Sequence, residues 1–344
     1  MSANGTRPSH LLVGTLLGAG LLLGFMAPAM AASKSEASSL LPKYCQPTHG
    51  ALSHVASLRC QSLHVMVLRP HVMVLMMENQ SFSDIIANPS APYQNQLARS
   101  YKTATNYYGV GHYSLDNYLA AITGNFYAWS TGDCSPGPGC QSSDATLANQ
   151  LDAAGIPWDA YMGSMPTDCD TSNYDNGTVG HSYGVRHNPF VYFPDLVKTD
   201  CARDQPSANM LGALDAANPP DFVWYSPQIC DDGGGDDACA TIAAGDRFLS
   251  REIPAIERTP WYKHGGVVVL TYDEGDSMGQ GQGEHLTGEG NHLLTVVISA
   301  ATAGKPDYTA YVNHFGLLAS IEKAFGLGCM NQACTASNGH LALS

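Results

Sequence analysis

Two acidic strings each follow an apolar run that is typical of a buried β-strand. Residues 73–77 read Met-Val-Leu-Met-Met and lead straight into Glu78, while residues 267–270 read Val-Val-Val-Leu and lead through two residues into Asp273 and Glu274. Such runs fit a sheet covered on both faces, where ligands bind beyond the carboxyl ends of the strands. Buried carboxylates there are unfavourable unless they bind a cation, so the pattern predicts a metal site. The alternative is that these are solvated loop carboxylates that cap helices.

Extended and helical patterns alternate along the rest of the chain, which predicts an α/β fold with a mostly parallel sheet. The expected strands are 73–77, 103–108, 156–162, 221–225, 267–272 and 294–299. The expected helices are 93–101, 115–122, 145–154, 208–217, 241–257 and 314–325.

The chain opens with the pattern of a secretion signal. Arg7 supplies a positive start, residues 11–25 are apolar and rich in glycine, and residues 29–31 match a small-x-small cleavage site. Because the apolar stretch is too short for a convincing membrane span, we expect a secreted protein, extracellular or periplasmic, without stable membrane insertion. The expected organisation is a signal peptide at 1–31, an N-terminal extension at 32–63 and a single domain at 64–344.

The charge balance argues against nucleic acid as a partner. Charged residues make up 13% of the chain and the formal net charge is −14, so the protein repels nucleic acid and anionic membrane surfaces. An acidic enzyme that handles anionic substrates needs a local positive centre, and 16 Lys and Arg residues are few. The composition therefore also favours a bound metal ion.

Ten cysteines follow the predicted signal, none of them in a Cys-x-x-Cys spacing. An even number in an oxidising compartment predicts disulfides, and pairing of consecutive cysteines is the simplest arrangement, although the sequence allows others. The expected pairs are Cys45–Cys60, Cys134–Cys140, Cys169–Cys201, Cys230–Cys239 and Cys329–Cys334.

Ser114 is the candidate nucleophile. It lies at the start of the helix expected at 115–122, where free backbone N–H groups and the helix dipole attract anions, and Asn117 returns to the same end one turn later. An ordinary serine N-cap is the alternative, but a metal held by the two acidic strand ends would activate the hydroxyl. Ser81 is the rival, and we expect it instead to cap a helix that begins at Phe82.

A loop at 183–190 brings Arg186 and His187 together. The arginine can pair with a phosphate, and the histidine can bind metal or donate a proton, although an isolated histidine is more often structural. Other histidines with no comparable local argument are His181, His264, His285 and His292.

A second loop, between Cys230 and Cys239, contains four carboxylates that repel one another. This loop therefore either holds a cation or is well solvated. Asp246, on the helix that follows, is expected to be an ion-pair partner.

Taken in order, these strings resemble the phosphoesterase family that includes secreted acid phosphatases, phosphoinositide phosphatases and bacterial phospholipases C. The chain looks closest to the small phosphatase branch. The similar strings are Glu78-Asn79-x-Ser81, His112-x-Ser114-x-x-Asn117-Tyr118, His187-x-Pro189-Phe190, Tyr225-Ser226-Pro227, Thr271-Tyr272-Asp273-Glu274-Gly275, and Asn313-His314 ahead of Ser320-Ile321-Glu322-x-x-Phe325-Gly326-Leu327. The family usually has an Asn-Asp-x-His-Asp string after the Ser-Pro strand end, and here that histidine is missing from residues 231–237.

The resemblance implies a three-layer α/β/α fold of the alkaline-phosphatase type, with Ser114 as the phosphoryl acceptor and Asn117 as a ligand of the phosphate oxygens. The residues that it implies as proton donors, or as supports for the groups that touch the substrate, are His112, His187 and His314. The residues that it implies as ligands of a divalent metal are Glu78, Asn79, Ser114, Asp273 and Glu274.

The predicted function is a secreted, metal-dependent phosphomonoesterase of the acid phosphatase type that acts through Ser114. Oxygen ligands favour Mg²⁺, Ca²⁺ or Mn²⁺, and the histidines leave Zn²⁺ open. The expected substrate is a small phosphate ester or a phosphoinositide. The alternatives are a phosphodiesterase similar to phospholipase C, and a binding protein that kept the fold but lost turnover through the altered acidic loop.

Overall fold

The computed structural model describes residues 69–343 apart from 130–131, 178–180, 236 and 276–290. These residues form a seven-stranded sheet in the order β2-β10-β9-β1-β8-β4-β7, in which β10 alone runs antiparallel to its neighbours. The strands are β1 (His71–Met77), β2 (Lys102–Thr103), β4 (Trp158–Met162), β7 (Asp204–Pro206), β8 (Phe222–Ser226), β9 (Gly266–Tyr272) and β10 (Val296–Ile298). The predicted α/β fold with a mostly parallel sheet is confirmed.

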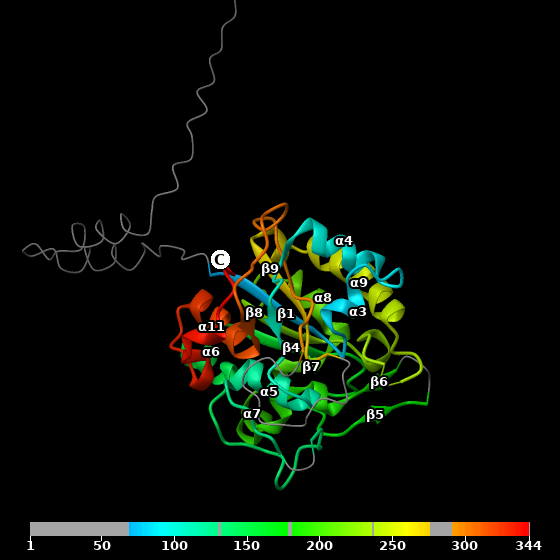
Figure 1. Ribbon diagram of the computed structural model, residues 1–344. Helices are drawn as coiled ribbons and strands as arrows, with labels where there is room; N and C mark the ends of the chain where they lie inside the picture. The colour runs from blue at the N-terminus through cyan, green and yellow to red at the C-terminus, as the bar shows by residue number, and fades with distance from the viewer. Residues whose placement is uncertain (1–68, 130–131, 178–180, 236, 276–290, 344) are drawn as a thin grey trace, which may run out of the picture. The chain divides into compact units, whose positions relative to one another are not determined.

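Helices cover both faces of this sheet, and Figure 1 shows α4 and α9 on one side of it and α5, α7 and α11 on the other. The first layer comprises α3 (Phe82–Ile85), α4 (Pro92–Ser100), α8 (Met210–Leu214), α9 (Ile242–Arg258) and α10 (Pro260–Lys263). The second layer comprises α5 (Ser114–Thr123), α6 (Leu147–Ala153), α7 (Pro194–Thr199) and α11 (His314–Phe325). The result is the three-layer α/β/α arrangement that the resemblance implied.

Shorter elements complete the described chain. Seven 3₁₀ turns are η1 (Val185–His187), η2 (Pro189–Tyr192), η3 (Cys201–Arg203), η4 (Ser207–Asn209), η5 (Ile229–Asp231), η6 (Asn331–Cys334) and η7 (Ala336–Asn338). Two small sheets pair β3 (Tyr107–Tyr108) with β11 (Val312–Asn313) and β5 (Tyr174–Asp175) with β6 (Ser182–Tyr183).

The central strands β1 and β9 are buried along almost their whole length, which explains why they read as continuous apolar runs. Parallel strands covered by helices on both faces have no solvent side, so no polar residue alternates with the apolar ones. The two strands pair in register from His71 opposite Gly266 to Met77 opposite Tyr272. Their carboxyl ends therefore lie side by side.

Two expected strands differ from the structure. The segment 103–108 divides, because only β2 joins the main sheet and the chain then turns so that β3 pairs with β11. The segment 294–299 is a strand only over β10, which runs antiparallel to β9 in a sheet that is otherwise parallel. The expected helix at 208–217 is also shorter, since it starts as η4 and its α-helical part is α8.

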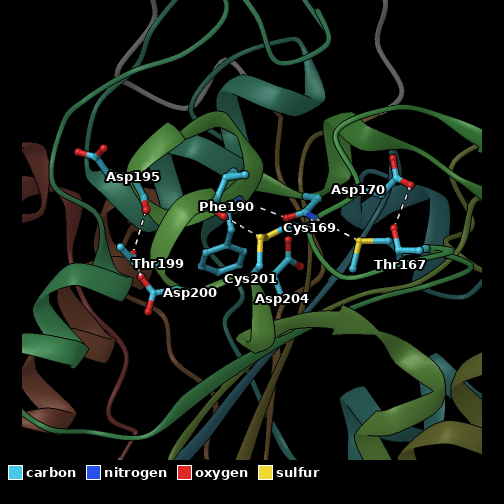
Figure 2. The surroundings of a disulfide bond; sticks show 12 residues. Thr167, Cys169, Asp170, Phe190, Asp195, Thr199, Asp200, Cys201 and Asp204 are labelled. Carbon is cyan, nitrogen blue, oxygen red and sulfur yellow. Dashed lines mark hydrogen bonds between the residues drawn. A yellow bond between two sulfur atoms is a disulfide. The ribbon is translucent and has the colours of Figure 1, made fainter.

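Four of the expected disulfides are present: Cys134–Cys140, Cys169–Cys201, Cys230–Cys239 and Cys329–Cys334. Cys45–Cys60 lies outside the described residues, as does the expected secretion signal. Figure 2 shows how Cys169–Cys201 ties the segment after β4 to η3, close to Asp204. In the part of the chain that the structure describes, no helix has the length and apolarity to cross a bilayer.

Candidate active site

Glu78, Asn79 and Asp273 meet where β1 and β9 end. The backbone N–H of Asp273 donates to the carbonyl of Met77 at 3.0 Å, so the backbone hydrogen bonding between β1 and β9 continues one residue beyond β9. The backbone N–H of Asn79 then donates to Oδ1 of Asp273 at 2.9 Å. Asn79 has a φ of 55°, a left-handed conformation that asparagine tolerates better than most residues. The structure thus brings the two acidic strand ends together.

Glu78 is the centre of this cluster and is fully buried. The hydroxyl of Ser114 donates to its Oε2 at 2.9 Å, and the hydroxyl of Tyr118 donates to its Oε1 at 2.6 Å. Nε2 of His187 lies 3.3 Å from Oε2. A serine, a tyrosine and a histidine from two different segments therefore surround one carboxylate.

Ser114 is the first residue of α5, and Tyr113 is its N-cap. All ten residues of this helix are buried, and it ends at Gly124 in the left-handed conformation typical of a C-cap. The N–H of Leu115 donates to Oδ1 of Asp133 at 2.9 Å. Oδ2 of Asp133 also lies 3.9 Å from Nε of Arg186. Asp133 therefore connects the first turn of the helix to the guanidinium of Arg186.

Asn117 holds the loop that precedes α5. Its Oδ1 accepts hydrogen bonds from the N–H groups of Val110 and Gly111, at 2.9 and 3.3 Å. Its Nδ2 donates to the carbonyls of Gly111 and Tyr113, at 2.9 and 3.1 Å. Both amide hydrogens are thus used by the backbone, so these contacts favour a positioning role over the direct contact with phosphate oxygens that the resemblance implied.

His112, in the same loop, pairs with the second residue of the other acidic string. Its Nδ1 lies 2.6 Å from Oε2 of Glu274, and both side chains are largely buried. Glu274 therefore orients an imidazole in this structure, in addition to any contact with a metal.

His187 stacks on Tyr118 with the ring centroids 5.5 Å apart and the planes within 7°. On its other side, Nδ1 lies 3.9 Å from Oδ2 of Asp232, a buried residue of the acidic loop. Asp232 is held by the N–H of Gly234, and a Cβ added to this glycine would lie 2.6 Å from Cβ of Glu78. The loop is therefore divided: Asp232 belongs to the site, while Asp237 is exposed.

His314 lies deeper and contacts the backbone of the acidic strand end. Its Nε2–H donates to the carbonyl of Asp273 at 2.5 Å, and its Nδ1 accepts from the hydroxyl of Tyr107 at 2.9 Å. Burial lowers the pKa of His314 to about 4, partly offset by the hydrogen bond to Asp273. A neutral, buried imidazole with both nitrogens occupied supports Asp273 and is poorly suited to donate a proton.

The other candidates are distributed as follows. Ser81 is the N-cap of α3, as expected. Asp246 was expected to form an ion pair, but among the described residues its carboxylate instead accepts the N–H groups of Tyr93 and Gln94, because these first residues of α4 have no partner within their own helix. His292 stacks between Phe82 and Tyr108.

Two further histidines singled out in the sequence, His181 and His264, are exposed, and His285 lies outside the described residues.

The donor set suits a hard cation. Burial, and then the neighbouring Glu78, raise the pKa of Asp273 well above its usual range. Its Oδ2 is buried and accepts no hydrogen bond within the described residues. Those residues contain no group of three or more His, Cys, Asp or Glu side chains already arranged as a metal site. Two buried carboxylates with an asparagine and a serine beside them nevertheless fit a cation with oxygen ligands.

Three members of the site had no individual role predicted from the sequence: Tyr118, Asp133 and Asp232. Tyr118 had a usable signal, since it lies four residues after Ser114 and a helix places such residues on one face. Asp232 lies in the acidic loop that the sequence marks as either cation-binding or solvated, but its place beside His187, like that of Asp133 at the start of α5, depends on a loop path that the whole fold sets.

Comparisons with known proteins agree with this architecture. The model of the Phosphoesterase family matches residues 86–328. A phosphatidylinositol-3-phosphatase of Mycobacterium tuberculosis is 24% identical over 258 residues, covering 75% of this chain and 77% of the relative. A phosphate-repressible acid phosphatase of Penicillium chrysogenum is 26% identical over 262 residues, covering 73% of this chain and 58% of the relative. The chain thus spans little more than half the length of that fungal protein.

Among solved structures, a protein of the alkaline phosphatase superfamily from Vibrio parahaemolyticus has a similar fold. Its TM-score is 0.52 at 14% identity, and the match covers 79% of this chain and 69% of that one. Because the family model covers most of the chain and the fold agrees, the protein belongs to the phosphoesterase family.

Proposed function

We propose that this protein is a phosphomonoesterase that acts through Ser114. The observation that carries the proposal is the hydrogen bond from Ser114 Oγ to Glu78 Oε2, made at the first turn of a buried helix and beside the ends of two parallel strands. The similarity to acid phosphatases and to a phosphoinositide phosphatase supports this reaction class.

In this proposal Glu78 accepts the proton of Ser114 as Oγ attacks phosphorus. The Oγ–P bond forms, and the bond from phosphorus to the alcohol oxygen breaks. Tyr118 and His187 hold Glu78 in place through their contacts with its two oxygens. Water then cleaves the phosphoserine and releases inorganic phosphate.

His112 is the group that we assign to protonate the departing alcohol. Glu274 fixes the orientation of its imidazole. Asn117 keeps the loop that carries His112 in register with Ser114, through its four backbone hydrogen bonds. His314 supports Asp273 from behind.

A divalent metal fits this site. The residues that would hold it are Glu78, Asn79, Ser114 and Asp273, with Glu274 beside them. A bound cation would supply positive charge to the phosphate oxygens and would stabilise the ionised hydroxyl of Ser114. The oxygen-rich donor set favours Mg²⁺, Ca²⁺ or Mn²⁺.

We also propose that the protein is secreted. The apolar segment at 11–25 followed by the small-x-small motif supports export, and disulfides such as Cys169–Cys201 are typical of an oxidising compartment.

The test is hydrolysis of p-nitrophenyl phosphate compared with bis-p-nitrophenyl phosphate, before and after treatment with a chelator. We expect turnover of the monoester, little turnover of the diester, loss of activity with chelator and recovery on adding back a divalent cation. Preferred cleavage of the diester would instead support a phosphodiesterase, and turnover of neither, with metal present, would support a binding protein.

A further inference from the structure

A polar pocket of about 340 Å³ lies beside the candidate active site and shares Arg186 with it. Arg186 is adjacent to His187 in η1, and its Nε lies 3.9 Å from Asp133, whose other oxygen caps the start of α5 next to Ser114. Asp133 thus links Arg186, on the wall of the pocket, to the first turn of the helix that carries Ser114. A volume of this size is at the lower end of the range of small-molecule sites.

The pocket is built by the small β5–β6 sheet and the acidic loop. The described side chains that give it its character are Tyr174, Asp175, Ser182, Arg186 and Asp237. The hydrogen bond from the N–H of Val185 to Asn173 joins the β5 segment to η1, next to His187. Ile229, which also lines the pocket, begins η5, and a Cβ added to Gly184 would lie 3.4 Å from both its side chain and that of His187, so little space separates Ile229 from His187.

The lining combines both signs of charge with an accessible aromatic ring. Asp175 and Asp237 are exposed carboxylates that can only accept hydrogen bonds when ionised, while Arg186 can only donate them. Tyr174 also lines the pocket and is 38% exposed. The two carboxylates would repel a second anionic group on the substrate, and a cationic alcohol without hydroxyl groups would form no hydrogen bond with this lining.

We infer that this pocket binds the alcohol part of the substrate and selects an uncharged, polyhydroxylated alcohol, as in a hexose monophosphate. Hydroxyl groups donate to carboxylates and accept from a guanidinium, so they match a lining of mixed charge. The apolar face of a sugar ring packs against the ring of Tyr174. This inference rests on the proposed function, because it names the substrate class of the same site.

The test compares kcat/KM for three substrates that differ in the charge of the alcohol: glucose 6-phosphate, glucose 1,6-bisphosphate and choline phosphate. We expect glucose 6-phosphate to be favoured about tenfold or more over the other two. In the double variant Asp175→Asn, Asp237→Asn, the ratio of kcat/KM for glucose 6-phosphate to kcat/KM for glucose 1,6-bisphosphate should fall about tenfold. Asp195→Asn removes an exposed carboxylate on α7 and should leave this ratio unchanged. A wild-type preference for the bisphosphate or for choline phosphate, or a ratio that the double variant does not change, would overturn the inference.

A binding measurement separates this inference from the proposed function. Glucose 6-phosphate and inorganic phosphate are titrated calorimetrically into Ser114→Ala, which cannot turn over the ester in the proposed mechanism, and into the double variant Ser114→Ala, Tyr174→Ala. Tighter binding of glucose 6-phosphate than of phosphate by Ser114→Ala, with the difference lost in the double variant, supports the pocket even if the wild-type protein does not hydrolyse p-nitrophenyl phosphate. Equal binding of the two ligands by Ser114→Ala contradicts the pocket even if the wild-type protein hydrolyses p-nitrophenyl phosphate.

Discussion

Ser114 Oγ lies 2.9 Å from Glu78 Oε2, although the two residues are 36 positions apart in the chain. Glu78 directly follows β1 and Ser114 begins α5, so this contact joins the carboxyl end of a central strand to the helix layer that covers the sheet. The geometry of the nucleophile therefore depends on how α5 packs on the sheet, and changes at that junction should affect turnover more than stability.

Ser114→Ala should abolish hydrolysis of p-nitrophenyl phosphate while the fold is retained, because Glu78 loses one of its donors, at roughly 1–3 kcal/mol, but keeps the hydrogen bond from Tyr118. Turnover and the urea unfolding midpoint are measured on the same preparation. The matched control is Ser81→Ala, which removes the N-cap residue of α3 and should cost about 1 kcal/mol of stability with turnover retained. A Ser114→Ala protein with near wild-type turnover would refute the proposed mechanism.

Tyr118→Phe should lower kcat about tenfold and also destabilise the protein. The change removes the hydrogen bond to Glu78 Oε1 but keeps the ring that stacks on His187, and a buried carboxylate that loses a donor costs roughly 1–3 kcal/mol. Tyr161→Phe is the control, since its hydroxyl donates to Asp159 within β4, away from the site. Both variants should lose stability, whereas kcat should fall in Tyr118→Phe alone; equal kcat values would contradict the role of Tyr118.

Gly234→Ala should reduce turnover by roughly 10- to 100-fold, because small displacements of catalytic groups have effects of this size. The added Cβ would lie 2.6 Å from Cβ of Glu78, so the carboxylate or the acidic loop must move. Gly212→Ala, in α8, meets no atom within 4 Å and should raise helix stability by up to about 1 kcal/mol without changing kcat. The measurement is kcat in both variants by steady-state kinetics. Wild-type activity in Gly234→Ala would contradict the prediction.

Asp204→Asn should make the protein more stable at neutral and higher pH. Burial raises the pKa of Asp204 from 3.8 to about 7, and the hydrogen bond from Asn188 only partly offsets this. The folded protein therefore binds this proton more tightly than the unfolded chain, so the free energy of unfolding falls as pH rises from about 4 to about 7. Asparagine cannot ionise and avoids that loss.

Urea unfolding near the two ends of this range measures the effect. The variant should exceed the wild type by on the order of 2–4 kcal/mol at about pH 8 and match it at about pH 4. Asp195→Asn, an exposed carboxylate paired with Lys198, should show no such pH-dependent difference. A constant difference between Asp204→Asn and wild type at both pH values would contradict the assignment.

The sequence by itself determined the local elements. Short, continuous apolar runs rich in Val, Leu and Met are typical of strands covered on both faces, so β1, β9 and the residues that end them were predictable. The helix His314–Phe325, closed by Gly326, was predicted with its boundaries, because its apolar periodicity and its C-cap glycine act within one turn. The same holds for close disulfides such as Cys329–Cys334, since short loops bring neighbouring cysteines together.

Only the tertiary structure decided which side chains meet. The hydrogen bond of Tyr118 with Glu78, the cap that Asp133 gives to Leu115 and the entry of Asp232 beside His187 each depend on the packing of segments far apart in the chain. The antiparallel direction of β10 is likewise set by how the chain returns to the sheet. Periodicity and capping record interactions within a few residues, whereas burial against another layer selects the rotamers and loop paths that assemble the site.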